Sequence, residues 1–347
     1  MEVSITILVP RLDHSGPVRG AIALFNGLNV LDASVRIIPI YDSMIEYNVP
    51  TDDFLLREKS FYAKIVRLKK NFSYEKKNKV KKQVIISFCI QSDLIAFMSG
   101  LGGITISSVR GNLYQNYKDD FGVSGNIIAW LHYNILSRLN ILTALNQTMK
   151  RELSTYSQNV VLIPNFIDEQ NIDNSGKQPD GAFKFVFVGK LSKRKAILET
   201  LEAFALCVSQ YPDIELHVIG IGPLMDEIIK IVKEKNLRSN VTIHGFLNNP
   251  LQIVKECDVF VLPSYSEGIS RAGMEALFLG KRCIMQNVDS NIELIESDKQ
   301  GKLIDNIVEL PDAMIEMLLV GRIPDNIILP KKFRQDQCSS QYMNLIG

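Results

Sequence analysis

Short apolar runs rich in β-branched residues alternate with segments of helical length along the whole chain. Runs that are apolar on both faces are typical of parallel strands that helices cover on each side. The pattern therefore predicts an α/β protein with two doubly wound parallel sheets, one in each half of the chain. The expected strands are 4–9, 36–40, 84–89, 104–109, 140–144 and 160–163 in the first half, and 183–188, 215–219, 241–244, 259–262 and 283–286 in the second.

A polar segment at 168–180, DEQNIDNSGKQPD, separates the two halves and shows no apolar periodicity. Since 347 residues are more than one ordinary core organises, we predict a first Rossmann-like domain at 1–168, a linker, and a second such domain at 181–330. Parallel sheets bind ligands at the carboxyl ends of their strands, so two such domains that face each other would form a ligand-binding cleft.

Composition narrows the class of protein. The 39 Lys and Arg residues nearly balance the 38 Asp and Glu residues, so no overall charge attracts nucleic acid. The five cysteines are odd in number and scattered, with no C-x-x-C pair to indicate metal or redox chemistry, which fits a reducing cytoplasm. We find neither a signal-peptide pattern nor an apolar run of the ~18 residues that a membrane span needs, and therefore expect a cytoplasmic protein. The sequons at Asn71, Asn146 and Asn240 are then chance matches.

The strand expected at 183–188 runs into a glycine turn at Gly189 and a basic loop, GKLSKRK, before a helix at 197–210. A strand, a tight turn and a helix N-terminus together favour an anion, because free backbone amides and the helix dipole both point toward it. Lys190 and Lys195, five residues apart, add positive charges that could meet a diphosphate. The segment alone is also compatible with a solvated basic loop.

Two glutamates flank the start of a second expected helix. In PSYSEGISRAGMEAL, Glu267 precedes the helix that begins near Ser270, and Glu275 lies inside it. Carboxylates accept the paired hydroxyl hydrogen bonds that sugar and ribose rings offer. The alternative is that Glu267 caps the helix and that Glu275 makes a surface contact. The backbone amides after Glu267 are candidate donors to phosphate oxygens, namely those of Gly268, Ile269 and Ser270.

The spacing of Glu267 and Glu275 resembles the E-x7-E signature of the group 1 retaining glycosyltransferases, which have the GT-B fold. Further segments similar to motifs of that family occur in the same order within residues 160–305. Several ordered motifs in suitable strand and helix contexts are far more specific than one glycine pattern. The matching segments are LIPNFID at 162–168, VGKLSKRK at 188–195, GIGP at 220–223 and VTIHGFL at 241–247.

The resemblance implies a role for each matching residue. Lys190 and Lys195 would bind the donor diphosphate; Lys190 stands where the family usually has arginine, so an ammonium replaces the bidentate guanidinium. Glu267 would contact the donor sugar and Glu275 the nucleotide ribose, while the amides after Glu267 would meet the sugar or the diphosphate. The implied reaction is transfer of a hexose-type sugar from a nucleoside-diphosphate sugar to a saccharide acceptor, with retention of anomeric configuration.

Toward the N-terminus the resemblance rests on fewer residues. Gly16, in the segment at 10–28, stands in a loop similar to the family's glycine loop near the acceptor and the diphosphate. Some members have a functional histidine after a middle strand, where this chain has Arg110 in SSVRGN. Arg110 could bind phosphate or an acidic acceptor, or form a structural ion pair. His14 and His132 are expected to be structural.

The resemblance implies no cofactor, since the nucleotide sugar is itself the donor substrate. The sequence has no D-x-D motif and no spaced His, Cys and carboxylate cluster at a strand end, so no metal is expected either. The last segment, 331–347, is similar to the family's closing helix, which packs back on the first domain. Two other functions remain open: a nucleotide-sugar epimerase or phosphorylase of similar fold, and a non-catalytic nucleotide-sugar-binding subunit.

A basic segment lies in the first half of the chain. Between residues 61 and 82, nine basic residues stand against one acid, Glu75. Apolar residues recur there at roughly helical spacing, which predicts an amphipathic helix at 55–72 with a cationic face. The segment 55–82 is either solvated or attracted to an anionic membrane surface. Many bacterial members of the family that this chain resembles glycosylate lipid-linked acceptors at the cytoplasmic leaflet of the membrane. The resemblance therefore implies a peripheral membrane protein that acts in surface polysaccharide assembly, such as that of O-antigen, lipopolysaccharide or capsule.

Overall fold

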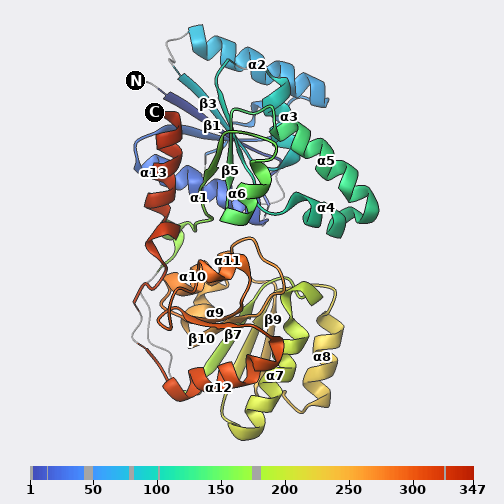
Figure 1. Ribbon diagram of the computed structural model, residues 1–347, viewed down its shortest axis with the longest axis vertical. Helices are drawn as coiled ribbons and strands as arrows, with labels where there is room; N and C mark the ends of the chain where they lie inside the picture. Colours follow the sequence, from blue (N-terminus) through green and yellow to red (C-terminus); the bar gives the residue numbers. More distant parts are fainter. Residues whose placement is uncertain are drawn as a thin grey trace. The chain divides into compact units, whose positions relative to one another are not determined.

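The computed structural model describes residues 3–13, 15–42, 50–77, 82–100, 102–173, 181–323 and 326–347. Three parts of the sequence prediction lie outside the described residues: His14, the linker at 174–180, and residues 78–81 of the basic segment with the side chains at 75–77. The described chain forms two compact units, each with one six-stranded parallel sheet and helices around it (Figure 1). Unit 1 comprises Met1–Asn171 and Lys332–Gly347, and unit 2 comprises Ile172–Lys331.

The sheet of unit 1 has the strand order β2-β1-β3-β4-β5-β6. Its central strands are buried because their β-branched side chains pack on both faces; Ile7 of β1 lies opposite Ile37 of β2 and Ile86 of β3, and all three are fully buried. The strands are β1 Val3–Val9, β2 Ser34–Pro39, β3 Lys82–Ser87, β4 Ile104–Ser108, β5 Ile141–Ala144 and β6 Val160–Leu162. The helices are α1 Gly16–Val30, α2 Phe61–Lys77, α3 Cys89–Met98, α4 Leu113–Phe121, α5 Gly125–Leu136, α6 Gln147–Leu153 and α13 Gln335–Ile346.

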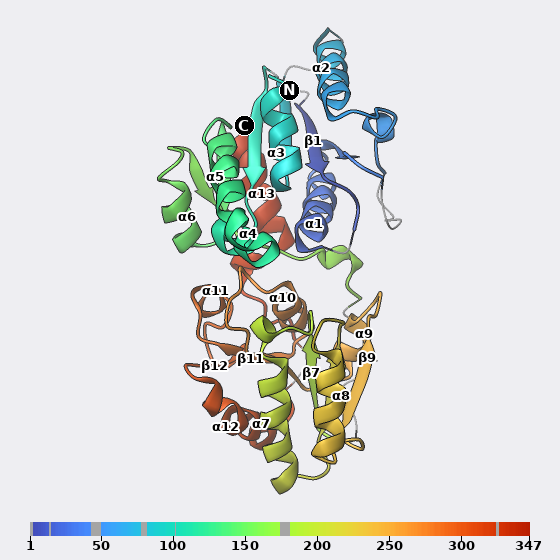
Figure 2. The ribbon, with the colours of Figure 1, turned by 90° about the vertical axis from the view of Figure 1, so that its right-hand side faces the viewer.

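The sheet of unit 2 has the strand order β12-β11-β10-β7-β8-β9. Buried aromatic side chains pack into its core, among them Phe185 and Phe187 of β7 and Phe260 of β10. Helices α7 and α8 lie in front of this sheet in Figure 2. The strands are β7 Lys184–Val188, β8 Glu215–Ile219, β9 Val241–Gly245, β10 Val259–Leu262, β11 Arg282–Gln286 and β12 Gly301–Ile304. The helices are α7 Ile197–Gln210, α8 Met225–Glu234, α9 Leu251–Lys255, α10 Arg271–Phe278, α11 Asp289–Ile292 and α12 Leu310–Val320.

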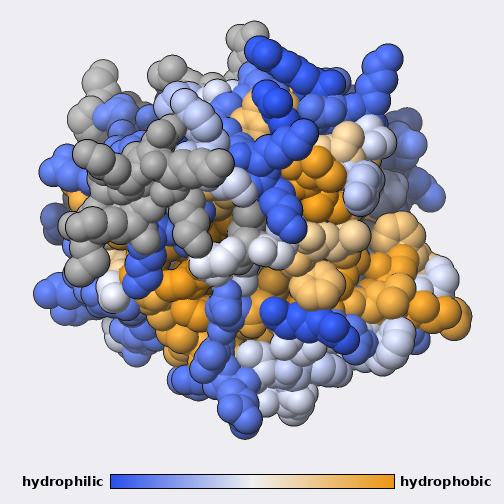
Figure 3. Space-filling view, turned by 90° about the horizontal axis from the view of Figure 1, so that it is seen from above, coloured by the Kyte–Doolittle hydropathy of each residue, from blue (hydrophilic) through white to orange (hydrophobic). Residues whose placement is uncertain are grey.

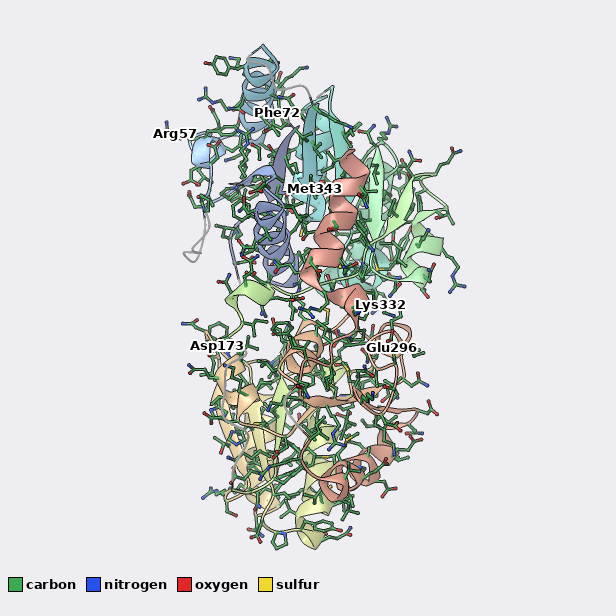
Figure 4. All side chains as sticks on the ribbon, turned by 90° about the vertical axis from the view of Figure 1, so that its left-hand side faces the viewer. Arg57, Phe72, Asp173, Glu296, Lys332 and Met343 are labelled. Atoms are coloured by element: carbon green, nitrogen blue, oxygen red, sulfur yellow. The ribbon has the colours of Figure 1, made fainter. Side chains whose placement is uncertain are left out.

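The closing segment of the chain belongs to unit 1. Helix α13 packs on α1 so closely that a Cβ on Gly27 of α1 would lie 2.0 Å from Ser339 Oγ. The hydroxyl of Tyr342 lies 2.8 Å from Ser108 Oγ at the end of β4. Figure 4 shows α13, marked by Met343, beside the strands of this sheet. The chain therefore returns to its first unit after it has completed the second.

Two elements differ from the sequence prediction. Strand β12 is missing from the expected strands, because its four residues, GKLI, contain one β-branched side chain and no alternation. Its Gly301 has φ +139°, and a Cβ there would lie 1.9 Å from Cys283 O, so the close approach of β11 and β12 requires glycine. The helix expected at 55–72 is wrong at its start: Leu55 belongs to a 3-10 turn, Asp53–Leu55, and α2 begins at Phe61.

Candidate functional site

The two predicted segments of unit 2 meet where the strand order reverses. Strands β7 and β10 are neighbours, with Val259 opposite Phe185, although β8 and β9 come between them in the chain. After β7 the chain continues to β8 and β9 at one edge of the sheet, and after β10 it continues to β11 and β12 at the other edge. Such a reversal opens a crevice at the carboxyl ends of the strands, where open α/β sheets bind ligands. The basic loop at 189–195 follows β7 and Glu267 follows β10 at this end of the sheet.

Glycines hold the loop after β7 in place. Gly220 has φ +141°, and a Cβ there would lie 1.9 Å from Gly189 O; a Cβ on Gly222 would lie 2.2 Å from Leu191 O. Only glycine fits at these two positions, because any side chain would collide with the neighbouring backbone. The two loops are also bonded, since Leu191 N donates to Ile221 O at 3.0 Å. The turn after β8 therefore positions the loop that carries the predicted lysines.

Lys195 and Glu267 are in direct contact. Lys195 Nζ donates to Glu267 Oε1, and the two side chains are only 12% and 9% exposed. Burial lowers the pKa of the Lys195 ammonium, and the paired carboxylate of Glu267 opposes that shift. The contact joins the two predicted segments, which are 72 residues apart in the chain.

Arg194 strengthens the same junction. Its Nη1 donates to Ser266 O at 2.6 Å and lies 3.6 Å from Glu267 Oε2. In return, Tyr265 N donates to Arg194 O at 3.0 Å. A third cation therefore joins the site, one that sequence reasoning noted in the basic loop without giving it a role. The loops after β7 and β10 form one structural piece.

Gly189 and Lys190 lie at the carboxyl end of β7. A Cβ on Gly189 would make only ordinary contacts, at 3.8–3.9 Å, with Leu262, Phe187 and Lys195. The fold does not demand glycine there, and its missing side chain leaves space beside Lys195. Lys190 is exposed and forms no ion pair with any residue that the structure describes. It is thus accessible for a ligand anion, whereas Lys195 already has a carboxylate partner.

The structure decides the alternatives for the two glutamates. The N-cap of α10 is Ser270, whose Oγ accepts a hydrogen bond from Gly273 N at 3.2 Å, so Glu267 does not cap this helix. Glu275 is buried inside α10, which excludes a surface contact. Ile269 is buried as well, whereas Gly268 is half-buried at the turn before the helix.

Two apolar residues at the same end of the sheet were missed by sequence reasoning. Ile221 is the second residue after β8 and Phe246 the first after β9, and they are 56% and 50% exposed. The two strand ends are joined, because Gly220 N donates to Gly245 O at 2.8 Å. Large apolar side chains exposed beside a cationic loop offer a surface for a planar ring. The signal in the sequence is an apolar residue directly after a strand-ending glycine, in GIGP and HGFL.

In unit 1, Gly16 is the first residue of α1, and a Cβ there would meet nothing within 4 Å. Arg110 follows β4; its Nη1 donates to Asn165 Oδ1, and its guanidinium lies 4.9 Å from the centroid of the Phe88 ring. Burial lowers the pKa of Arg110, whose Nε and Nη2 are enclosed without a hydrogen-bond partner in the described part of the chain. The structural ion pair considered for Arg110 is not formed with any described residue.

Unit 1 also contains His132, which is buried and bonded to Asp93 and Tyr117. Across the described ranges, no group of three or more His, Cys, Asp or Glu side chains is placed to hold a metal ion. No described helix is both long and apolar enough to cross a bilayer. All five cysteines are free thiols, and burial raises the pKa of Cys207 and of Cys257 to about 12.

Comparison with known proteins matches residues 168–325 to the family described as Glycosyl transferases group 1. UDP-Gal:alpha-D-GlcNAc-diphosphoundecaprenol alpha-1,3-galactosyltransferase of Escherichia coli is 28% identical over 207 residues, 56% of this chain and 52% of the relative. N-acetylgalactosamine-N,N'-diacetylbacillosaminyl-diphospho-undecaprenol 4-alpha-N-acetylgalactosaminyltransferase of Campylobacter jejuni is 32% identical over 148 residues, 42% of this chain and 40% of the relative. The chain spans about half the length of the curated relatives it matches.

Solved structures resemble nearly the whole chain. HepE of Anabaena, solved with UDP and glucose, has a TM-score of 0.75 over 99% of this chain and 98% of that chain, at 14% identity. TarM of Staphylococcus aureus has a TM-score of 0.73 over 100% and 99%, also at 14% identity. Sucrose-phosphate synthase of Thermosynechococcus elongatus has a TM-score of 0.69 over 99% and 98%, at 17% identity. The two parallel six-stranded sheets and these likenesses show that the chain has the GT-B fold, and its residues 168–325 match the group 1 glycosyltransferases.

Proposed function

We propose that the protein is a retaining glycosyltransferase that moves a sugar from a nucleoside-diphosphate sugar to a saccharide acceptor. The observation that carries this proposal is the contact between Lys195 and Glu267 at the reversal point of the unit 2 sheet. One bound molecule can reach both a cation for its diphosphate and a carboxylate for its sugar. The relatives from E. coli and C. jejuni are named for undecaprenol-diphosphate-linked acceptors, which supports a lipid-linked acceptor in surface polysaccharide assembly, such as O-antigen or capsule.

The side chains of the site supply the positive charge in this scheme, and no metal or cofactor is part of it. As the bond between the sugar and the diphosphate breaks, negative charge grows on the leaving oxygens. Lys195, Lys190 and the backbone amides of 268–270 stabilise that charge, and Lys195 does so in a nearly dry position. The acceptor hydroxyl attacks from the side on which the diphosphate leaves and gives its proton to the leaving phosphate, so the configuration is retained. Glu267 binds the donor sugar and Glu275 the ribose.

On the acceptor side, the candidates are Gly16 and Arg110 of unit 1. The open space around the Gly16 Cα admits a ligand at the N-terminus of α1. Arg110 lacks a carboxylate partner among the described residues, and its enclosed Nε and Nη2 would bind an anionic acceptor group once the side chains around them move aside. Both roles are tested by measuring the release of nucleoside diphosphate while the acceptor concentration is varied.

The decisive test is release of nucleoside diphosphate from a panel of nucleotide sugars. We expect slow release with the cognate donor alone and faster release when a lipid-linked saccharide acceptor is added. Interconversion of the sugar without release would instead identify an epimerase, and tight binding without either reaction would identify a non-catalytic subunit. A thermal-shift screen selects the donor first, because a ligand that binds only the folded protein raises its melting temperature.

Phe246 is expected to pack against the nucleotide base. The Phe246→Ala variant should weaken donor binding about tenfold, because a lost aromatic contact with a base is worth ~1–3 kcal/mol. Titration calorimetry with the nucleoside diphosphate measures the change. Leu319→Ala, at a side chain of unit 2 that is 69% exposed on α12, is the matched control. Equal affinity of Phe246→Ala and wild type would place the base elsewhere.

The positive charge of the basic segment 55–82 supports a peripheral location at the inner face of the cell membrane, whereas the apolar face of its helix α2 does not contribute to membrane contact. The apolar face of α2 is not free, since Ile65, Leu68 and Phe72 are buried in unit 1. Lys64 also points inward, where its Nζ donates to Leu55 O at 2.7 Å and burial lowers its pKa. The cations left exposed on the described part of α2 are Arg67, Lys69 and Lys70. Anionic lipid attracts such residues by ~1 kcal/mol each near the surface.

A further inference from the structure

The hairpin of α4 and α5 exposes an apolar surface. Ile127, Trp130 and Leu131 recur at helical spacing on the outer face of α5 and are 64%, 56% and 48% exposed. Phe121 and Val123 lie at the turn that joins the two helices, with Val123 86% exposed. Helix α5 contains no charged residue over its twelve positions. Single exposed apolar side chains are ordinary, but five within eleven residues mark an interaction surface.

The hairpin is anchored from the inside by buried polar groups. Ser87 Oγ donates to Asp93 Oδ1 at 2.6 Å, Asp93 Oδ2 lies 2.8 Å from His132 Nε2, and His132 Nδ1 lies 2.9 Å from the Tyr117 hydroxyl. This chain of contacts links β3, α3, α5 and α4. An ordinary surface helix turns its polar side chains to water. Here the histidine of α5 faces the core and the tryptophan faces outward, so the apolar face is presented by a fixed element.

Cations lie after the hairpin and on α2, which is joined to it through α3. Helix α3 contacts both α5 and α2, and it lies between them in Figures 1 and 2. Arg138, just after α5, lies with its guanidinium 5.7 Å from the ring centroid of Phe97 at the end of α3. Within the hairpin, Lys118 is followed in the sequence by two acids, Asp119 and Asp120, so α4 has no net positive charge, and the further cations are those of α2 and Arg138. In Figure 3 apolar side chains gather at the right, the side on which α4 and α5 lie in Figure 1, and another apolar area lies at the lower left.

We propose that the apolar face at 121–131 inserts into the headgroup region of an anionic bilayer while the cations of α2 contact the lipid phosphates. Stable attachment without a membrane span takes two signals, an apolar element and a basic one. Because the apolar face of α2 is buried, the hairpin is the element that we assign to the first signal. Tryptophan prefers the interface between hydrocarbon and water, which suits Trp130. The inference rests on the proposed function, in which the acceptor carries a membrane lipid.

The only tryptophan of the chain lies on this face, which gives a direct probe. Trp130 emission is recorded for the full-length protein with vesicles of phosphatidylcholine alone and of phosphatidylcholine mixed with phosphatidylglycerol. We expect a blue shift with the anionic vesicles, and quenching by lipids brominated on their acyl chains. The Val123→Glu/Ile127→Glu variant should bind these vesicles at least about tenfold more weakly. Val308→Glu/Leu319→Glu, at exposed apolar positions of unit 2, should bind as wild type does.

Two outcomes would overturn the proposal. Vesicle binding with unchanged Trp130 emission and no quenching would mean that charge alone attaches the protein. A blue shift that grows with protein concentration in the absence of lipid, together with dimers in sedimentation, would assign the face to a second copy of the chain. Binding of the nucleotide-sugar donor to the wild-type protein is measured separately, without vesicles. If no donor bound, the glycosyltransferase proposal would be contradicted, and the result with vesicles would still stand. Because quenching is read on the wild-type protein, the decision does not depend on folding of the variant.

Discussion

Glu267→Ala and Lys195→Ala should each lower turnover about a hundredfold or more, since the loss of one charge-stabilising contact is worth ~3 kcal/mol in the transition state. The backbone bond from Tyr265 N to Arg194 O holds the loops after β7 and β10 together and so fixes the contact of Lys195 with Glu267. The measurement is kcat/KM with the cognate donor and acceptor. Near-normal rates in both variants would refute the assigned roles.

A loss of stability could imitate this effect, because each single variant breaks the contact between two nearly buried charges. The Lys195→Met/Glu267→Gln double variant removes both charges. It should melt close to the wild-type temperature and still be inactive, which separates catalysis from folding. Lys302→Ala is the matched control: it also breaks an ion pair of unit 2, with Glu316, but both side chains are exposed. Exposed pairs contribute little, so this variant should keep its activity.

Chain order and pattern predicted most of the fold. The strand prediction succeeded where β-branched residues form a run, because burial on both faces demands such residues. It failed at β12, where the backbone approach of Gly301 to Cys283 fixes the strand and leaves no apolar pattern. Periodicity also joined Leu55 to α2 wrongly, since it reports which residues are buried and not whether the helix is continuous.

The candidate site was predictable in part for a similar reason. Doubly wound topology brings the ends of β7 and β10 together, so segments that follow them could be assigned to one place. The sequence pattern could not show which lysine contacts Glu267. Lys190 and Lys195 are the same residue type in the same loop, and only the path of the backbone turn makes Lys195 point to Glu267 and leaves Lys190 exposed. Nor could it find the hairpin face: the charge-free stretch of α5 has the composition of a buried helix, and its exposure depends on which elements pack over it.

Gly220→Ala should have the second large effect, on both stability and donor binding. A side chain at φ +141° is strained, and its Cβ would lie 1.9 Å from Gly189 O, an atom of the loop that carries the lysines. We expect the unfolding free energy to fall by ~3 kcal/mol or more, because strain and a backbone clash add. The loop must also move away from the strand end, which separates Lys195 from the ligand position.

The Gly245→Ala variant separates the effect of the steric clash at Gly220 from the effect of backbone strain. Gly245 also has a positive φ, +68°, but a Cβ there would meet nothing within 4 Å. This variant should lose only ~1–2 kcal/mol, the usual strain of a left-handed residue. Thermal melting with and without the nucleoside diphosphate compares the two, and Gly220→Ala should show a smaller ligand-induced rise than Gly245→Ala. If both variants melted alike and gained equally from the ligand, the turn after β8 would not position the phosphate loop, and the donor site would have to be sought on other elements of unit 2.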